Sequence, residues 1–391
     1  MRILLSTFGS GGDLFPLIPV VNELSASGCE VLVATSRGLG LYLRSVGIQS
    51  VGLGDGSEMI GLEDSRLFTS RFDGWASWWR TANTYVARSL KPDFAVLESV
   101  IDQWRPDVVV AFGFSTAARL AAVASGTRLI NMSMYPQLER LAGRRLGFGG
   151  DLLHNLRALV PGVDGNSLLE SMVGWGQPAD VLLHDRALLA EGATVTEPVG
   201  FTYWDAAHSA SEDVVNLEAW LREGSSDPTL LVTMGSLIGV VSRDAWLDLV
   251  GVIQDLGVRA AFVGMRKGWA QRELEVRPGL IAVGYVPLSR YLGQFDAAVH
   301  HGGLGTTFAC LRAGVPAVVD PQAFDQPFNG RLLQAVGAGV LTVGEGFRPA
   351  IEQVLSNGSI RVEARRVGLS LIDPVDAAEA AVSAILSLAA K

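Results

Sequence analysis

The residues from His300 to Thr307 read His-His-Gly-Gly-Leu-Gly-Thr-Thr and follow the short apolar run Phe295–Val299. The run predicts a buried strand, the glycines predict a turn, and the stretch Thr306–Ala313, closed by Gly314, predicts a helix. Such a turn leaves unpaired backbone N–H groups and the positive end of a helix dipole at one spot. That spot suits a phosphate or a diphosphate. We therefore expect a nucleotide diphosphate site at a strand–helix junction.

Strand-length apolar runs alternate with helical patterns along the whole chain. This alternation predicts parallel sheets covered by helices on both faces. At 391 residues the chain is long for one hydrophobic core. We expect an α/β fold of two doubly wound Rossmann-like domains. Its strands are predicted at 2–7, 30–35, 107–113, 128–133, 180–184 and 195–199, then at 229–234, 259–264, 280–284, 297–300, 316–320 and 340–343.

The expected organisation is a first domain over residues 1–205, a linker over 206–228, a second domain over 229–372 and an Ala-rich helix over 373–391. Ligands of such sheets bind at the carboxyl ends of the strands. The glycine-rich turns near Gly9 and Gly302 are therefore expected to face a shared cleft.

Charge and cysteine content exclude some classes of partner. The net charge is −9 and no basic stripe is present, so nucleic acid is not an expected partner. Cys29 and Cys310 fit no metal or redox spacing and are expected to be free thiols. No signal peptide and no run of ~18 apolar residues is recognisable, which predicts a cytoplasmic protein.

The His300–Thr307 stretch, with Gln322 and the pair Asp325-Gln326, resembles the donor-site signature of inverting nucleotide-sugar glycosyltransferases. The segment Met1–Leu17 resembles the opening strand, loop and helix of the bacterial enzymes that decorate glycopeptide, macrolide and other antibiotics. The resemblance spans nearly the whole chain but is specific only in these segments. It implies the two-domain GT-B fold, in which the C-terminal helix returns to the first domain.

The resemblance also implies the roles of the donor-site residues, while His300 faces the other side of its strand and is expected to be structural. Purely structural interpretations compete with these roles. The two histidines could end a strand without binding a ligand, Asp325 could be a helix N-cap, and Tyr285 could lie in an ordinary turn. The diphosphate is expected at Gly235, Ser236, His301, Gly303, Gly305, Thr306 and Thr307, the base at Tyr285 and Val286, and the sugar hydroxyls at Asp325 and Gln326.

One position departs from the pattern of relatives that use UDP-sugars. They commonly carry a Glu eight residues after the diphosphate histidine, where it binds both ribose hydroxyls. This chain has Ala309 there. A ribose without its 2′-hydroxyl depends less on that Glu, so we expect dTDP-sugars to be preferred as co-substrates.

Asp13 is the expected general base. Inverting transfer requires the acceptor hydroxyl to lose its proton as it attacks the anomeric carbon. Many relatives place a His in the first glycine-rich loop, whereas this chain has Asp13, as the glycopeptide-modifying relatives do. The competing interpretation is an N-cap of a helix over 14–26, whose dipole would lower the pKa of the carboxyl.

The sequence signals for the acceptor-binding site are less specific than those for the donor site. An aromatic cluster in the first domain suits a wall around an apolar aglycone, but it equally suits a core or a membrane surface. The acceptor residues expected are Gly12, Phe72, Trp75, Trp79, Met132 and Tyr135.

Other enzyme classes lack their motifs. There is no GxGxxG, no P-loop and no HExxH, and Gly113–Ala117 is one residue short of a nucleophile elbow. No metal or cofactor is expected beyond the sugar nucleotide. The sequence favours an inverting dTDP-sugar-dependent glycosyltransferase acting on a hydrophobic natural product. A UDP-sugar-dependent lipid or sterol glycosyltransferase and a non-catalytic sugar-nucleotide-binding helper remain alternatives, and the oligomeric state is open.

Overall fold

The computed structural model describes residues 1–54, 90–113, 115–136, 179–189, 196–205, 211–235, 241, 243–265, 274, 277–322, 325–342 and 346–391. The chain divides into two compact units. Unit 1 comprises Met1–Arg186, Glu191–Thr202 and Ile372–Lys391, and unit 2 comprises Ala187–Ala190 and Tyr203–Leu371.

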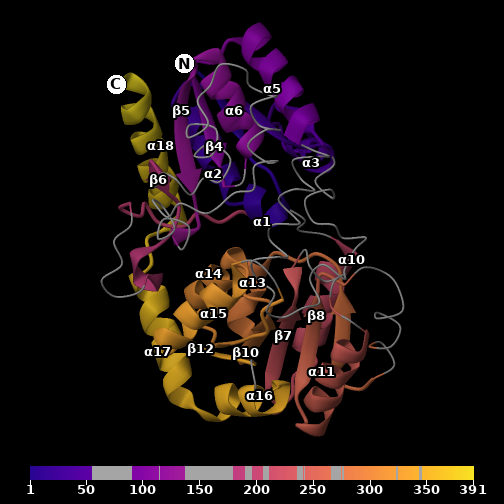
Figure 1. The fold of residues 1–391 in the computed structure, drawn as a ribbon. Helices are drawn as coiled ribbons and strands as arrows, with labels where there is room; N and C mark the ends of the chain where they lie inside the picture. The colour runs from indigo at the N-terminus through magenta and orange to yellow at the C-terminus, as the bar shows by residue number, and fades with distance from the viewer. Residues whose placement is uncertain are drawn as a thin grey trace, which may run out of the picture. The chain divides into compact units, whose positions relative to one another are not determined.

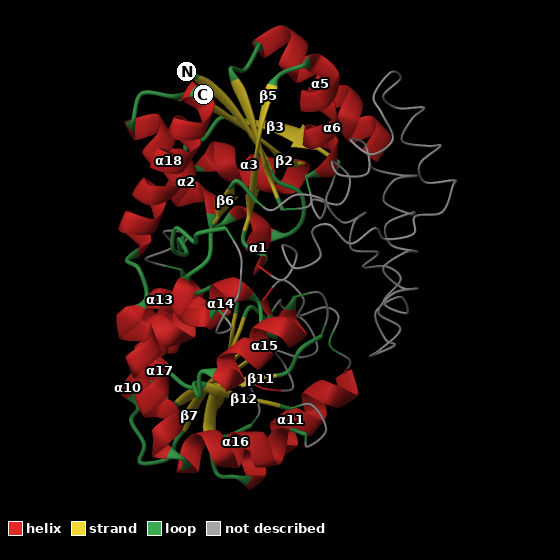
Figure 2. Cartoon of the chain, turned by 60° about the vertical axis from the view of Figure 1, so that its left-hand side comes forward, coloured by secondary structure: helices red, strands yellow, loops and turns green. Residues whose placement is uncertain are grey.

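The described part of unit 1 contains a six-stranded parallel sheet in the order β3-β2-β1-β4-β5-β6. Helices α2 and α18 cover one face and α5 and α6 the other (Figure 2). The strands are β1 (Arg2–Ser6), β2 (Glu30–Ser36), β3 (Ser50–Leu53), β4 (Val108–Phe112), β5 (Arg128–Ser133) and β6 (Val181–Leu182). The helices are α1 (Gly11–Leu14), α2 (Leu17–Ala26), α3 (Arg37–Ser45), α5 (Lys91–Trp104), α6 (Thr116–Ser125) and α18 (Pro374–Ala390). The chain passes from unit 1 to unit 2 within the 3₁₀ turn η3 (Arg186–Leu188).

Unit 2 repeats this topology, with the order β12-β11-β10-β7-β8-β9 among its described strands (Figure 1). The strands are β7 (Thr229–Thr233), β8 (Arg259–Val263), β9 (Leu280–Val283), β10 (Ala297–His300), β11 (Ala317–Val319) and β12 (Gly339–Leu341). The helices are α10 (Glu212–Arg222), α11 (Arg243–Asp255), α13 (Leu288–Tyr291), α14 (Leu304–Arg312), α15 (Gln326–Ala335), α16 (Phe347–Ser356) and α17 (Gly358–Ser370), with the 3₁₀ turn η5 (Leu292–Gln294). Two doubly wound Rossmann-like domains are thus confirmed.

The apolar runs of the sequence become the centres of the two sheets. Every residue of β4 and of β8 is buried, as expected for parallel strands covered on both faces. Each sheet changes direction of winding between two neighbouring strands, β1 and β4 in unit 1 and β7 and β10 in unit 2. Loops leave the sheet on opposite faces at such a point, and ligands bind there at the carboxyl ends of the strands.

Three local expectations differ from the structure. Strand β3 was not predicted, because only Leu53 of its four residues is buried and its apolar pattern is weak. The predicted strand at 195–199 reduces, in its described residues, to a single bridge between Leu182 and Pro198. The helix expected over 14–26 is interrupted, because Pro16 lacks an N–H donor and its ring clashes with the preceding turn.

The C-terminal helix α18 lies within the stretch 373–391 expected to be helical and belongs to unit 1. The Asp373 side chain caps it by accepting from the Val375 N–H. The helix packs on α2, β5 and β6 (Figure 1). Arg128 donates to the Leu388 carbonyl at 2.7 Å. The return of the chain to the first domain is therefore confirmed. The stretch expected as a linker contains α10, which packs against β9.

Candidate active site

His301 lies at the switch point of unit 2, directly after β10 and beside the residues that follow β7. Its imidazole packs between two glycines. A Cβ on Gly235 would lie 2.7 Å from His301 Cε1, and a Cβ on Gly303 would lie 2.5 Å from His301 Nε2. Gly235 also has a φ of +54°, a conformation that favours glycine. Both glycines are therefore needed to leave room for the His301 ring.

Burial lowers the pKa of His301 to about 4, against a hydrogen bond with the Thr233 backbone that raises it. The ring is consequently neutral at neutral pH. A neutral imidazole still carries one N–H donor, so His301 can serve an anion through a hydrogen bond, without a positive charge of its own.

His300 has the structural contact expected of it. The Gly302 N–H donates to His300 Nδ1 at 3.0 Å, and the ring is fully buried. Burial, with His301 nearby, lowers the pKa of His300 to about 3. His300 therefore remains neutral and holds the start of the glycine turn against the sheet.

Helix α14 begins at Leu304 with Gly303 as an N-cap that offers no side-chain hydrogen bond. The first backbone N–H groups of a helix have no partner within it, so this terminus is suited to an anion. The two threonines differ. Thr306 is partly exposed, whereas Thr307 is fully buried and its hydroxyl donates to the Gly303 carbonyl at 3.0 Å. The Thr307 hydroxyl is thus used by the helix itself rather than directed outward to a phosphate.

The pair Asp325-Gln326 is held by hydrogen bonds at the start of α15. Asp325 occupies the N-cap position, but its side chain makes no capping hydrogen bond. Its Oδ2 instead accepts from Asn329 Nδ2 at 2.6 Å, and the same Asn329 nitrogen donates to the Gly302 carbonyl at 2.9 Å. Gln326 Oε1 accepts from the Gln322 N–H at 2.8 Å. Asn329 therefore connects the glycine turn to the Asp325 carboxylate.

The corner after β9 carries the two expected base-binding residues. The Asp213 carboxylate accepts from the Gly284 N–H at 2.8 Å and so fixes the chain just before Tyr285. Tyr285 is 37% exposed and Val286 only 1%, so the Tyr285 side chain and the backbone are the accessible parts of this corner. Burial, with Asp205 and Tyr285 nearby, raises the pKa of Tyr203 above its ordinary value.

In unit 1, Asp13 lies in the short helix α1 that follows β1, at the switch point of that sheet. Ser10, not Asp13, is the N-cap of α1, and Asp13 is the third helical residue of a capping box. Asp13 Oδ2 accepts from the Ser10 N–H at 2.9 Å, and Asp13 Oδ1 accepts from the Tyr135 hydroxyl at 2.7 Å. Gly9 has a φ of +132°, and a Cβ there would overlap the Asp13 carboxylate.

Burial raises the pKa of the Asp13 carboxyl, while the hydrogen bonds from Tyr135 and Ser10 lower it in part. The expectation that a helix dipole lowers this pKa is thus not met. The physical reason is that α1 has only four residues, so its dipole is small, and burial disfavours the charge more strongly.

The expected acceptor residues are distributed unevenly. Gly12 is exposed beside Asp13, whereas Met132 is fully buried in β5 opposite Phe112. Met132 therefore belongs to the core of unit 1, and its contact with the acceptor stays a prediction. The Tyr135 hydroxyl is bonded to Asp13. Phe72, Trp75 and Trp79, as well as Ser236 of the donor site, lie outside the described residues.

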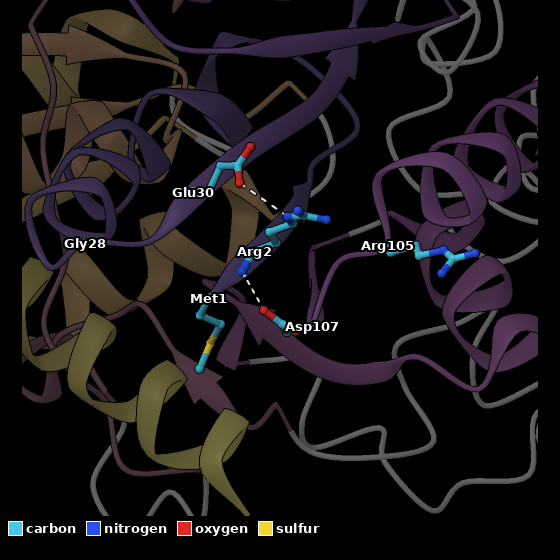
Figure 3. A pocket seen from close by; sticks show the side chains of 6 residues that line it. All are labelled: Met1, Arg2, Gly28, Glu30, Arg105 and Asp107. Carbon is cyan, nitrogen blue, oxygen red and sulfur yellow. Dashed lines mark hydrogen bonds and ion pairs between the residues drawn. The ribbon is translucent and has the colours of Figure 1, made fainter.

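A pocket of about 450 Å³ lies at the amino end of the unit 1 sheet, beside the first residues of β1 and β2 (Figure 3). Arg2 crosses it, pairing with Glu30 at 3.3 Å and donating its backbone N–H to Asp107 at 2.7 Å. This edge is opposite to the one that carries Asp13, so the pocket is not part of the candidate site. Among the described residues, no cluster of His, Cys, Asp and Glu is arranged to hold a metal ion.

Sequence reasoning did not assign the roles of Asn329 and Tyr135 seen here. For Asn329 a signal was present, since it follows Asp325 by four residues, the spacing at which side chains meet on a helix. For Tyr135 no local signal exists, because 122 residues separate it from Asp13.

Two sequence families match separate parts of the chain. The family described as glycosyltransferase family 28 N-terminal domain matches residues 3–130. The family described as erythromycin biosynthesis protein CIII-like, C-terminal domain, matches residues 265–379. The two matches include Asp13 and His301, respectively.

Individual proteins align over most of the chain. The 3-alpha-mycarosylerythronolide B desosaminyl transferase of Saccharopolyspora erythraea is 24% identical over 94% of this chain and 93% of its own length. A sterol 3-beta-glucosyltransferase of Saccharomyces cerevisiae is 24% identical over 86% of this chain but only 30% of its own length. The solved structure of the spinosyn rhamnosyltransferase SpnG shares the fold, with a TM-score of 0.72 at 21% identity over 96% of this chain and 98% of that one. The same enzyme complexed with thymidine diphosphate gives a TM-score of 0.68 at 20% identity, over 96% and 98%. No helix in the described ranges is both long and apolar enough to span a membrane.

Proposed function

We propose that this chain, a nucleotide-sugar-dependent glycosyltransferase of the antibiotic-biosynthesis type, transfers a sugar from a dTDP-sugar to a hydroxyl group of a hydrophobic natural product. The transfer proceeds with inversion at the anomeric carbon. Unit 2 binds the donor and unit 1 supplies the base, so the reaction requires residues of both units.

The diphosphate binds at the switch point of unit 2. The neutral His301 ring donates one N–H, the first N–H groups of α14 point to the same oxygens, and Thr306 adds a hydroxyl. These donors stabilise the charge that collects on the departing diphosphate as the bond to the sugar breaks. The overall charge of −9 does not stabilise an anionic diphosphate. The local N–H groups and the dipole of α14 therefore provide this stabilisation.

Asp13 takes the proton of the acceptor hydroxyl. The hydroxyl oxygen then forms a bond to the anomeric carbon, and the electron pair of the breaking carbon–oxygen bond leaves with the diphosphate. The raised pKa of Asp13 makes its carboxylate a stronger base than an ordinary aspartate. Asp325 and Gln326, held by Asn329 and Gln322, bind hydroxyls of the sugar.

The single observation that carries this proposal is the His301 ring packed between Gly235 and Gly303 at the N-terminus of α14. The preference for dTDP rests on Ala309, which shares a helical face with Gly305 and offers no carboxylate to a ribose 2′-hydroxyl. The thymidine diphosphate complex of SpnG, a protein of the same fold, supports the same nucleotide.

Thermal unfolding with dTDP or UDP, at matched concentrations, tests the proposal. A ligand that binds only the folded protein, present at 100 times its dissociation constant, adds about 2.7 kcal/mol of stability. We expect a larger increase in Tm with dTDP. A shift with neither nucleotide would contradict the donor site.

The match to a sterol glucosyltransferase favours one second candidate, transfer from a UDP-sugar to a sterol or lipid. A larger increase in Tm with UDP than with dTDP would favour it over the first proposal.

A further inference from the structure

The Tyr135 side chain lies between residues that follow two other strands: its ring approaches Gly113 and its hydroxyl reaches Asp13. Asp13 follows β1, Gly113 follows β4 and Tyr135 follows β5, and these three strands are neighbours in the sheet. Parallel strands present their carboxyl ends at the same edge, so residues distant in sequence are brought together there. The Tyr135 hydroxyl reaches Asp13 Oδ1 at 2.7 Å across 122 residues of sequence.

The Tyr135 side chain is held from two further directions. Its backbone N–H donates to the Ser133 hydroxyl at 3.0 Å, and its ring lies 3.5 Å from the position a Cβ on Gly113 would take. Only 6% of Tyr135 is exposed. A ring fixed in this way places its hydroxyl at one point, whereas a flexible surface tyrosine would sample many.

The two oxygens of Asp13 have different partners. Oδ1 accepts from Tyr135, and Oδ2 accepts from the Ser10 N–H at 2.9 Å and the Ser10 hydroxyl at 3.3 Å. A carboxylate oxygen can accept more than one hydrogen bond, so these bonds orient the group and still leave it able to receive a proton.

We propose that Tyr135 is a positioning residue, which holds the Asp13 carboxylate ionised and aimed at the acceptor hydroxyl, and is not itself a wall of the acceptor site. This inference rests on the proposed function, in which Asp13 is the base. Tyr135 keeps its own proton throughout, and Asp13 receives the proton of the acceptor.

The groups that face Asp13 determine in which direction its pKa changes when the Tyr135 hydroxyl is removed. Among the described residues, those that act on its carboxyl are Tyr135, Ser10 and its own backbone, and no charged side chain contributes. A donor to the ionised form lowers a carboxyl pKa. Removing the Tyr135 hydroxyl therefore raises the pKa of Asp13 further. The acid limb of the pH–activity profile, where activity falls because Asp13 becomes protonated, then moves to higher pH.

The first test is a ¹³C NMR titration of protein labelled at aspartate Cγ, with the Asp13 signal assigned by its loss in Asp13→Asn. In Tyr135→Phe we expect the titration midpoint of this signal to move to higher pH. The matched control is Tyr291→Phe. Tyr291 also donates to a carboxylate at 2.7 Å, that of Glu218 in unit 2, so it loses the same kind of bond elsewhere. The control should leave the Asp13 midpoint unchanged.

The second test is the pH profile of dTDP release from dTDP-glucose, with water as the acceptor. We expect Tyr135→Phe to lower kcat by about tenfold at neutral pH, part of the effect of a general base, with unchanged affinity for dTDP and an acid limb at higher pH. An unmoved NMR midpoint, or a changed KM with an unmoved acid limb, would overturn the inference. If Asp13→Asn retains full activity, the proposed base is wrong, and the NMR titration still decides whether Tyr135 acts on Asp13.

Discussion

Replacing Gly303 by alanine tests whether the position of the His301 ring determines donor affinity. Gly303 has φ −63° and ψ 141°, which alanine adopts without strain. The new Cβ, however, would lie 2.5 Å from His301 Nε2, where ordinary contact begins at 3.4 Å. The imidazole must therefore move by about 0.9 Å, the difference between these two distances.

The expected loss is that of one hydrogen bond to a charged group. Such a bond is worth roughly 1.5–3 kcal/mol, and each 1.4 kcal/mol is tenfold in affinity. We expect the Kd for dTDP, measured by isothermal titration calorimetry, to rise by roughly 10- to 150-fold.

A double-mutant cycle isolates the mechanism. If Gly303→Ala acts through the ring, it should have little further effect in a His301→Ala background. Gly305→Ala is the matched comparison, because a Cβ there meets nothing within 4 Å in the protein. Any loss of affinity in that variant would report contact with the ligand itself. Unchanged dTDP affinity in Gly303→Ala, or an equal loss with and without His301, would refute the role given to the ring.

Two further predictions concern other parts of the structure. Asn329→Leu removes the donor shared by Asp325 and the Gly302 carbonyl, so we expect the variant to bind dTDP-glucose no better than dTDP. Calorimetry with both ligands would detect this, and an unchanged preference for the sugar nucleotide would contradict it. Burial lowers the pKa of His184 from 6.5 to about 4, so its contribution to stability is complete above pH 6.5 and is lost as the pH falls toward 4. At pH 5 the loss is about 2 kcal/mol. In His184→Gln the drop in the free energy of unfolding between pH 7.5 and 5 should be smaller by that amount, and a drop equal to that of the unmutated protein would show that His184 is not the cause.

Local patterns in the sequence predicted most of the fold. The strand at 297–300 has the predicted bounds, and the helix at 374–390 lies within the predicted stretch 373–391. Continuous apolar residues, and a proline followed by an Ala-rich run, are local signals. Strand β3 and the interruption at Pro16 are not predicted, because their local signals are weak or ambiguous. An edge strand buries little, and a proline near a helix start is compatible with either one helix or two.

The sequence by itself determined that a glycine turn at His301 precedes a helix and that Asp13 follows a strand. The packing of segments far apart in the chain decided which of these groups can act. It placed Gly235 against the His301 ring, buried Met132 and the Thr307 hydroxyl, and brought Tyr135 to Asp13. Burial and contact arise only when strands β1, β4 and β5, or β7 and β10, lie side by side. No local sequence pattern determines which strands are adjacent, because adjacency depends on the strand order of the whole sheet.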